Sequence, residues 1–208
     1  WLRPNFADER GELKSLVQSF LIKSSGKNIL IDTCNGNGKS RPNVPQWGNL
    51  QTDYMQKFSK IGVNPEEIGY VACTHLHFDH VGWNTKKEGE KWRPTFLNAK
   101  YLFSKQEYDY WIKKPEKEMI DDFNGIDDSI TPIVEAGLAQ LIDDNYQLDK
   151  NIKFFPTPGH TPHHISVEIE SDGKKAIITG DVMHHPCQIA KPNWITGADT
   201  FPKQTVAT

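Results

Sequence analysis

The stretch Thr-His-Leu-His-Phe-Asp-His-Val-Gly at residues 74–82 holds three histidines and an aspartate within six residues. In an extended segment, residues two positions apart point the same way, so His75 and His77 can bind one cation. The turn that follows aims Asp79 and His80 at a neighbouring position. Imidazoles combined with a carboxylate form the ligand set that borderline metals such as zinc prefer. This density of ligands favours a metal site over the alternative, a polar loop with capping histidines.

All eight histidines of the chain lie in three short clusters, each of which follows a predicted strand. The clusters are His75, His77 and His80; His160, His163 and His164; and His184 with His185. In the second cluster a Pro-Gly turn at 158–159 fixes the direction of His160, which suits a third ligand. One or both of His163 and His164 are expected to hydrogen-bond the loop or to begin the next strand. Ahead of the third cluster, Asp181 follows a buried strand and a glycine, and its two oxygens can bind two cations separately.

Length and charge exclude several classes of protein. The chain has 208 residues, which fits one domain spanning residues 1–208. Its 24 lysines and arginines against 27 aspartates and glutamates give a net charge of −3, so no basic face predicts nucleic-acid binding. No apolar run approaches the roughly 20 residues that cross a bilayer. The three widely spaced cysteines form neither a disulfide framework nor a zinc pair, which favours a reducing, cytoplasmic location.

The hydrophobic pattern predicts an α/β domain in which strands and helices follow one another. Strands are predicted at 16–22 and 28–33, joined as a hairpin by a glycine turn, and at 70–73, 152–155, 165–169 and 176–179. Helices are predicted at 50–61, after the capping residue Ser104 with Glu107 three residues on, and from Ser129 or Asp128 through Ile142. The polar stretch 113–128 is predicted to be exposed.

Three motifs resemble the metallo-β-lactamase superfamily in their order along the chain: Thr-His-Leu-His-Phe-Asp-His at 74–80, Thr-Pro-Gly-His-Thr at 157–161, and Gly-Asp at 180–181. The resemblance extends from the hairpin near Leu16 to about Pro186, and Ile31-Asp32-Thr33 matches an early strand that ends in aspartate. It implies an αββα sandwich of two mixed sheets with outer helices and a dinuclear metal site at one edge.

The resemblance also implies a role for each site residue. The first metal would be held by His75, His77 and His160, the second by Asp79 and His80, and both by the bridging Asp181. Asp32 would orient a ligand histidine without touching the metal.

One departure from the family concerns the second metal. Family members normally supply it with a further histidine from a later segment, whereas no histidine follows His185 here. We expect that a C-terminal helix and strand are missing from the sequence. The alternatives are that His184 or His185 serves as the ligand, or that the second metal is held weakly.

The resemblance implies a hydrolase with two divalent cations, zinc in the first place, with manganese, iron or cobalt as alternatives. Two cations about 3.5–4 Å apart lower the pKa of a bridging water towards 7, so hydroxide is available to attack a carbonyl. Asp79 lies beside this hydroxide and can pass a proton to the leaving group. Within the superfamily the likeness is greatest to the lactonase-like branch, which includes N-acyl-homoserine lactone lactonases and a related organophosphate hydrolase. The expected reaction is the opening of a lactone or the cleavage of an ester, with phosphotriesters or β-lactams as alternatives.

The substrate is expected to be a small molecule. Lactonases carry a tyrosine three residues after the bridging aspartate, and His184 at this position can donate a hydrogen bond to an oxyanion in the same way. The alternative for His184 is a loop or spare metal-binding residue. Trp47 and Trp83 are expected to offer apolar surface to the substrate. Two other classes stay open, a diiron oxidoreductase and a metal-depleted binding module, and the oligomeric state is open with a dimer as one option.

Overall fold

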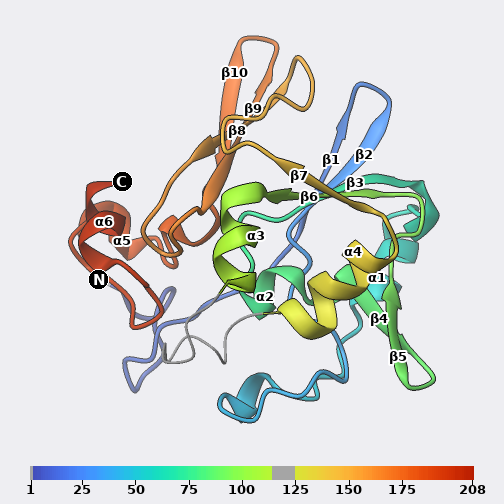
Figure 1. Cartoon of the computed structure of the whole chain (residues 1–208). Coiled ribbons are helices and arrows are strands. Elements are labelled where there is room, and N and C mark those ends of the chain that lie inside the picture. The colour runs from blue at the N-terminus through green and yellow to red at the C-terminus, as the bar shows by residue number, and fades with distance from the viewer. Residues whose placement is uncertain (1, 114–124) are drawn as a thin grey trace.

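Two sheets and a layer of helices form the fold in the computed structural model, which describes residues 2–113 and 125–208 (Figure 1). One sheet has the strand order β1 (Phe20–Ser24), β2 (Lys27–Ile31), β3 (Ile68–Ala72), β6 (Lys100–Ser104), β7 (Ala139–Ile142). The second has the order β10 (Lys174–Ile178), β9 (Ile165–Ser171), β8 (Ile152–Pro156), and a separate hairpin pairs β4 (Thr85–Glu88) with β5 (Lys91–Pro94).

The helices are short. They are α1 (Tyr54–Lys60), α2 (Phe78–Val81), α3 (Lys105–Ile112), α4 (Thr131–Glu135), α5 (Cys187–Ala190) and α6 (Pro202–Ala207). Single 3-10 turns lie at Pro45–Trp47, Pro65–Glu67, Gly82–Asn84 and Gly180–Val182, and one π-helical turn at Ile126–Ile130. Ser104 caps α3 as predicted, because its side chain accepts a hydrogen bond from the Glu107 amide. Within the described ranges, no helix is long and apolar enough to span a bilayer.

The predicted α/β class is confirmed, with one difference in the second sheet. In the five-stranded sheet β1 pairs antiparallel with β2, whereas β2, β3, β6 and β7 run parallel, so this sheet is mixed. The carboxyl ends of these parallel strands therefore meet at one edge. The three-stranded sheet is antiparallel throughout rather than mixed. Its strands follow one another directly along the chain, and such short connections join antiparallel neighbours.

The predicted helix through Ile142 is wrong in its second half. Helix α4 ends at Glu135, and Gly137 follows with a φ of +69°, a left-handed conformation that ends helices. Residues 139–142 then form β7, which lies parallel to β6 with Tyr101 opposite Ala139. The spacing of the apolar residues in this stretch fits both a helix and a strand. Pairing with β6 therefore decides that residues 139–142 form a strand. Strands β4, β5 and β6 were also absent from the predicted elements.

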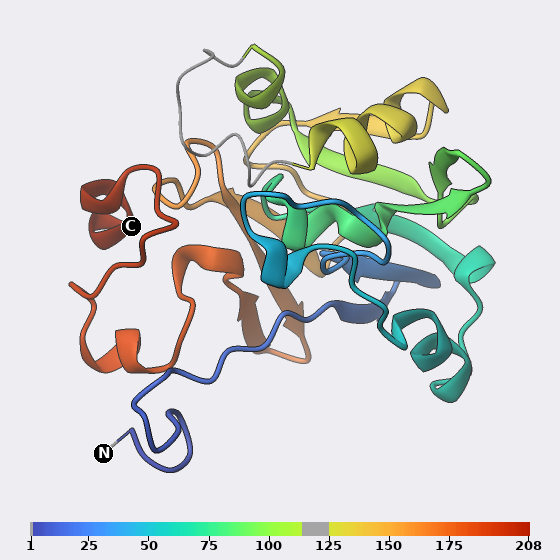
Figure 2. The same cartoon turned by 90° about the horizontal axis from the view of Figure 1, so that it is seen from below.

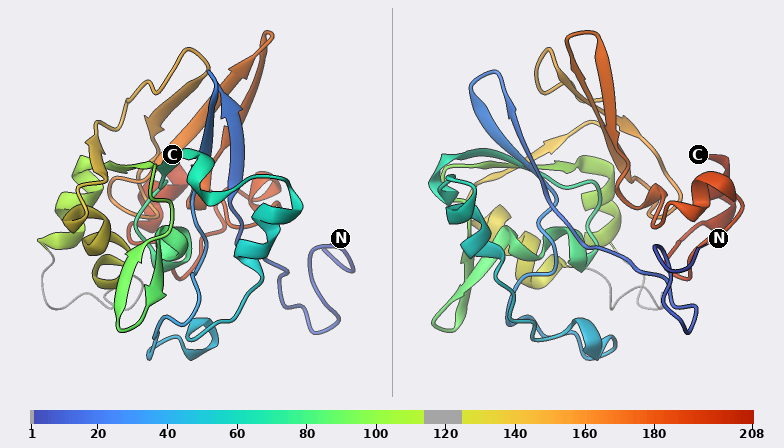
Figure 3. Two further views of the ribbon diagram at one scale, coloured as in Figure 1. Left: turned by 90° about the vertical axis from the view of Figure 1, so that its right-hand side faces the viewer. Right: turned by 180° about the vertical axis from the view of Figure 1, so that it is seen from behind.

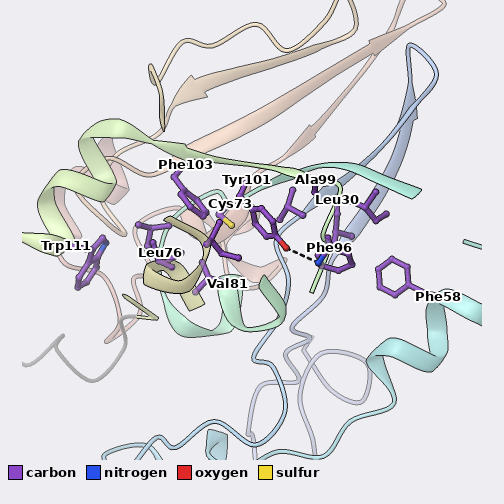
Figure 4. Packing of buried hydrophobic residues seen from close by; sticks show 14 of the residues in the cluster. Leu30, Phe58, Cys73, Leu76, Val81, Phe96, Ala99, Tyr101, Phe103 and Trp111 are labelled. Carbon is purple, nitrogen blue, oxygen red and sulfur yellow. Dashed lines mark hydrogen bonds between the residues drawn. The ribbon is translucent and has the colours of Figure 1, made fainter. Parts of the chain in front are cut away.

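Strand alternation builds the two hydrophobic clusters of the interior. Leu30 faces the helices, while Ile29 and Ile31 on either side face the second sheet. In β6 Tyr101 and Phe103 belong to the helix-side cluster, which Figure 4 shows together with side chains from the helical layer. The second cluster takes side chains from both sheets and so lies between them. Complete burial of one large apolar side chain contributes about 1.5–3 kcal/mol.

Asp128 corrects the prediction of an exposed stretch at 113–128, most of which, residues 114–124, lies outside the described part of the chain. The Asp128 carboxylate lies 3.2 Å from Lys39 Nζ and 2.6 Å from the Arg41 guanidinium. Both basic side chains are buried. The loop after β2 is thereby tied to the π-helical turn.

The hairpin turns lie at one end of the fold, and the N-terminal segment contacts the C-terminal part of the chain at the other. The turns of the β1–β2 and β9–β10 hairpins project together from one end (Figures 1 and 3). At the other end the segment before β1 runs beside the segment that contains α5 (Figure 2). There the His185 ring packs edge-on against Phe6, and its Nε2 donates a hydrogen bond to the Phe6 carbonyl over 3.2 Å.

Candidate metal centre

Four loops that follow strands carry the predicted site residues. Asp32 follows β2, residues 74–80 follow β3, His160 lies in the loop after β8, and Asp181 lies in the turn after β10. Strands β2 and β3 are parallel, so their carboxyl ends lie at one edge of the sheet. The loops after β8 and β10 reach the same place, because ligand atoms of His160 and of Asp181 each lie within 4.8 Å of one on His75.

Three imidazoles form the first ligand group. His75, His77 and His160 are buried, and each offers one ring nitrogen within 4.8 Å of the others. Their ring centroids are 4.6 Å apart for His75 and His77, and 4.7 Å apart for each of these rings and His160. The structure thus brings together residues that are up to 85 positions apart in the chain.

The second group is centred on Asp181. Its Oδ1 lies 3.2 Å from His80 Nε2, whereas its Oδ2 lies 3.5 Å from His160 Nε2. The two oxygens therefore face different histidine groups, which is the arrangement that a bridging carboxylate needs. Asp79 Oδ2 lies 3.8 Å from His80 Nε2 on the same side.

Asp32 holds two parts of the first motif. Its Oδ2 lies 2.8 Å from His80 Nδ1, and its Oδ1 accepts a hydrogen bond of 2.8 Å from the Thr74 amide. The Thr74 hydroxyl in turn lies 3.1 Å from His75 Nδ1. Asp32 therefore lies beside His80, and it belongs to none of the groups of converging ligand atoms.

Asp199 also lies at this centre, although no motif in the sequence indicates it. Its Oδ1 lies 3.0 Å from His160 Nδ1, and its Oδ2 accepts a hydrogen bond from the Thr196 amide. The Asp199 side chain is completely buried. A carboxylate on Nδ1 directs the Nε2 of the ring towards the other ligands. No local motif surrounds Asp199, because its partner is 39 residues away.

His164 fixes the turn that carries Asp181. Its Nε2 accepts a hydrogen bond of 3.1 Å from the Asp181 amide, and its Nδ1 lies 2.8 Å from the Thr157 hydroxyl. Gly180 adopts a φ of +53°, and a Cβ there would lie 2.5 Å from His164 Nε2. Only glycine fits this close approach. The prediction that His164 hydrogen-bonds its surroundings is confirmed, whereas the His163 ring lies 3.8 Å from Asp144.

Burial and neighbouring charges lower the pKa of some titratable groups at the centre and raise the pKa of others. Burial, reinforced by the neighbouring imidazoles, lowers the pKa of His75 and His77 well below the usual range. Burial also opposes the charged form of His80, but the Asp181 and Asp32 carboxylates outweigh it and raise the pKa of His80 well above that range. Burial raises the pKa of Asp79.

The residues present fit a bound divalent cation. His75 Nε2 is buried and has no hydrogen-bond partner among residues 2–113 and 125–208, while its Nδ1 is held by Thr74. The lowered pKa of His75 keeps its ring neutral, and a neutral imidazole is the form that binds metal. Nitrogen donors combined with carboxylates match zinc and related metals.

A cavity of about 390 Å³ opens beside the centre. Asp79, His80, Asp181 and His184 line its polar side, and Leu16, Phe20, Ile177, Met183 and Trp47 are among its other lining residues. Trp83 is not among the lining residues. It is buried, and its ring stacks on Tyr54 with centroids 5.3 Å apart, so the structure places it in the core rather than at the cavity.

His184 points into the centre and His185 points away. His184 Nε2 lies 3.2 Å from Asp181 Oδ2, and its ring centroid lies 4.8 Å from that of His160. Burial lowers the pKa of His184, but Asp181 outweighs this effect and raises it. His185 instead contacts the N-terminal segment, as described above.

Comparison with curated proteins identifies relatives of this chain. An N-acyl homoserine lactonase from Bacillus sp. is 27% identical over 178 residues, which are 78% of this chain and 62% of that protein. A beta-lactamase-like protein 2 homolog from Caenorhabditis elegans is 26% identical over 166 residues, 79% of this chain and 43% of that protein. The chain thus spans less than two thirds of the length of these curated relatives.

Solved structures share the fold. The crystal structure of a probable metal-dependent hydrolase from Staphylococcus aureus has a TM-score of 0.78 at 25% identity, covering 100% of this chain and 72% of that chain. A dizinc quorum-quenching lactonase with a bound product has a TM-score of 0.73 at 24% identity, covering 91% of this chain and 64% of that chain. The sequence profile described as the metallo-beta-lactamase superfamily matches residues 14–204. This match covers most of the chain, and the chain therefore belongs to the metallo-β-lactamase superfamily.

Proposed function

We propose that this chain forms one catalytic domain of a metal-dependent hydrolase that opens lactones or cleaves carboxylic esters. One observation carries the proposal: ligand atoms from separate loops meet in three groups, each within 4.8 Å. The first group is His75, His77 and His160, and the second joins His80 and Asp181 to His75. The third group is His160, His184 and Asp199. Relatives named N-acyl homoserine lactonase support the reaction class.

The proposed cofactor is a pair of divalent cations, zinc in the first place, with manganese, iron and cobalt as alternatives. His75, His77 and His160 would hold one cation, Asp79 and His80 the other, and Asp181 both. When bound, such a pair lowers the pKa of a shared water towards neutrality and so supplies a nucleophile.

Two residues of the chain would act on the substrate. Burial raises the pKa of Asp79, so its carboxyl group is suited to take up a proton at Oδ2 and to pass it to the leaving oxygen. His184, whose pKa Asp181 raises, would donate a hydrogen bond to the oxygen of the attacked carbonyl. Both side chains line the cavity, where a small-molecule substrate can reach them.

The apolar part of the cavity favours a substrate with a hydrocarbon arm. Leu16, Ile177 and Met183 line the cavity and remain 78%, 54% and 36% exposed, and Trp47 lies among the lining residues. Contact with such surfaces suits an acyl chain or an aromatic ester group.

The test combines metal analysis with a panel of substrates. The purified chain is expected to bind two zinc ions and to hydrolyse lactones or aryl esters faster than phosphotriesters or β-lactams. His77→Ala and Asp181→Ala should lose metal and turnover together while circular dichroism shows a folded chain. His185→Ala serves as the control and should keep both ions. Full turnover with unchanged metal content in either site variant would refute the assignment, and iron with redox activity would favour an oxidoreductase.

A further inference from the structure

A buried carboxylate lies behind the candidate metal centre, on helix α3. Glu107 is 1% exposed, and no lysine or arginine of the described residues forms an ion pair with it. Burial raises the pKa of Glu107 to about 7, although N–H donors around the carboxylate oppose this shift. A buried carboxylate without a cation is costly unless its oxygens are well hydrogen-bonded.

The hydrogen bonds of Glu107 join the two loops that carry the histidine trio. Its Oε1 accepts from the Leu76 amide over 3.4 Å, and Leu76 lies between His75 and His77. Its Oε2 accepts from the His163 amide over 3.1 Å, three residues after His160. One side chain therefore spans two loops that come from different sheets.

A further contact fixes the position of this carboxylate. The Trp111 indole donates to Oε1 over 2.7 Å, and the Trp111 ring packs edge-on against His77 with centroids 5.5 Å apart. Ser104 caps the helix by accepting a hydrogen bond of 3.2 Å from the backbone amide of Glu107, and this cap does not involve the carboxylate. Helix α3 thus presents the Glu107 carboxylate to both loops in one fixed orientation.

If position 107 served only to pack helix α3, an apolar side chain would fill it at a lower desolvation cost than a carboxylate. Replacing buried charged groups by well-packed apolar ones is often neutral or stabilising. Here the carboxylate offers acceptors to two loop amides that leucine could not satisfy, and both amides lie within three residues of a candidate ligand. The contacts therefore serve the spacing of the loops more than the packing of α3.

We propose that Glu107 is a positioning residue that holds the His75–His77 loop and the His160 loop at the separation required for one cation. This inference rests on the proposed metal site. It makes Glu107 a determinant of metal affinity through its hydrogen bonds to the Leu76 and His163 amides.

The test compares two changes on the same helix. Glu107→Gln keeps the shape but offers one acceptor oxygen in place of two, so one of the two loop amides must face an NH₂ group. Loss of such supporting contacts typically weakens metal binding by about 10- to 100-fold. Ser104→Ala removes the α3 cap, at about 1 kcal/mol of stability, and leaves every carboxylate acceptor in place.

Zinc affinity is measured by competition with a chelator at pH 8, above the pKa of Glu107, and at a temperature where both variants are folded. The expected result is a 10- to 100-fold loss for Glu107→Gln, by the same reasoning as above, and less than a twofold change for Ser104→Ala. Unchanged affinity in Glu107→Gln, or an equal loss in Ser104→Ala, would overturn the inference.

Hydrogen exchange supplies a second readout that needs no metal. In the metal-free wild type the Leu76 and His163 amides should exchange slowly, and in Glu107→Gln at least one should exchange at least tenfold faster. If Glu107→Gln does not fold, rapid exchange of both amides in the wild type would still refute the inference. Zinc binding without hydrolysis of any substrate would refute the proposed function and leave the role of Glu107 standing.

Discussion

Replacing Asp199 by alanine is expected to weaken zinc binding by roughly 10- to 100-fold, the range for partners that orient metal ligands. The buried Asp199 carboxylate lies 3.0 Å from His160 Nδ1, where it directs Nε2 towards the ligand group. A hydrogen bond to a charged group contributes about 1.5–3 kcal/mol. Since about 1.4 kcal/mol is a factor of ten in affinity, loss of this bond alone accounts for the expected range.

The assay is a zinc titration against a competing chelator at 25 °C, with circular dichroism as the test of folding. Asp199→Asn should lose less affinity than Asp199→Ala, because an amide oxygen still accepts from Nδ1 but carries no charge. The matched control is Asp149→Ala. The Asp149 carboxylate accepts hydrogen bonds from the backbone amides of Asn151 and Ile152 in a similar loop, and no histidine of the described residues is bonded to it. Asp199→Ala with zinc affinity within twofold of wild type would refute the orienting role.

Three further predictions concern the substrate oxygen, the buried lysine and the core. His184→Ala should lower kcat for ester hydrolysis by about 100- to 1,000-fold while two zinc ions remain bound, and the loss of one ion instead would make His184 a ligand. Burial lowers the pKa of Lys39 to about 8 from 10.5, so the unfolded chain binds more protons between these values. The free energy of unfolding of the wild type, measured by urea titration relative to Lys39→Met, should therefore rise with pH. The rise from pH 8 to pH 10.5 should be up to about 3 kcal/mol. A fall in this free energy over the same pH range would contradict the burial of Lys39. Tyr101→Phe should lower the free energy of unfolding by about 1–3 kcal/mol, because its hydroxyl accepts from the Phe96 amide and donates to the Asn84 carbonyl; equal urea midpoints would contradict this.

Much of the candidate site could be predicted because its residues carry local signals. The spacing of His75, His77, Asp79 and His80 is visible in six residues, and parallel strands bring the loops after them to one edge. The Pro-Gly turn before His160 is likewise a local feature. Ligand chemistry and strand ends together therefore explain why these residues converge.

The residues that depend on distant partners could not be predicted in this way. Asp199 acquires its role only through contact with His160, and Glu107 only because α3 packs behind two loops. The same holds for the fold, since residues 139–142 form β7 by pairing with β6 although their apolar spacing also suits a helix. Trp83 is the opposite case: it lies next to the histidine motif in the sequence, but its side chain belongs to the core rather than to the site.

The hairpin turns at Ser25–Gly26 and Asp172–Gly173 offer attachment points for chemical labels. Strands β2 and β10 each run five residues from such a turn to the loop that carries Asp32 or Asp181. At about 3.3 Å per residue, each turn lies roughly 16 Å from the ligand-bearing end of its strand. A fluorophore or surface tether placed on either turn would therefore report on the chain without crowding the cations or the entering substrate.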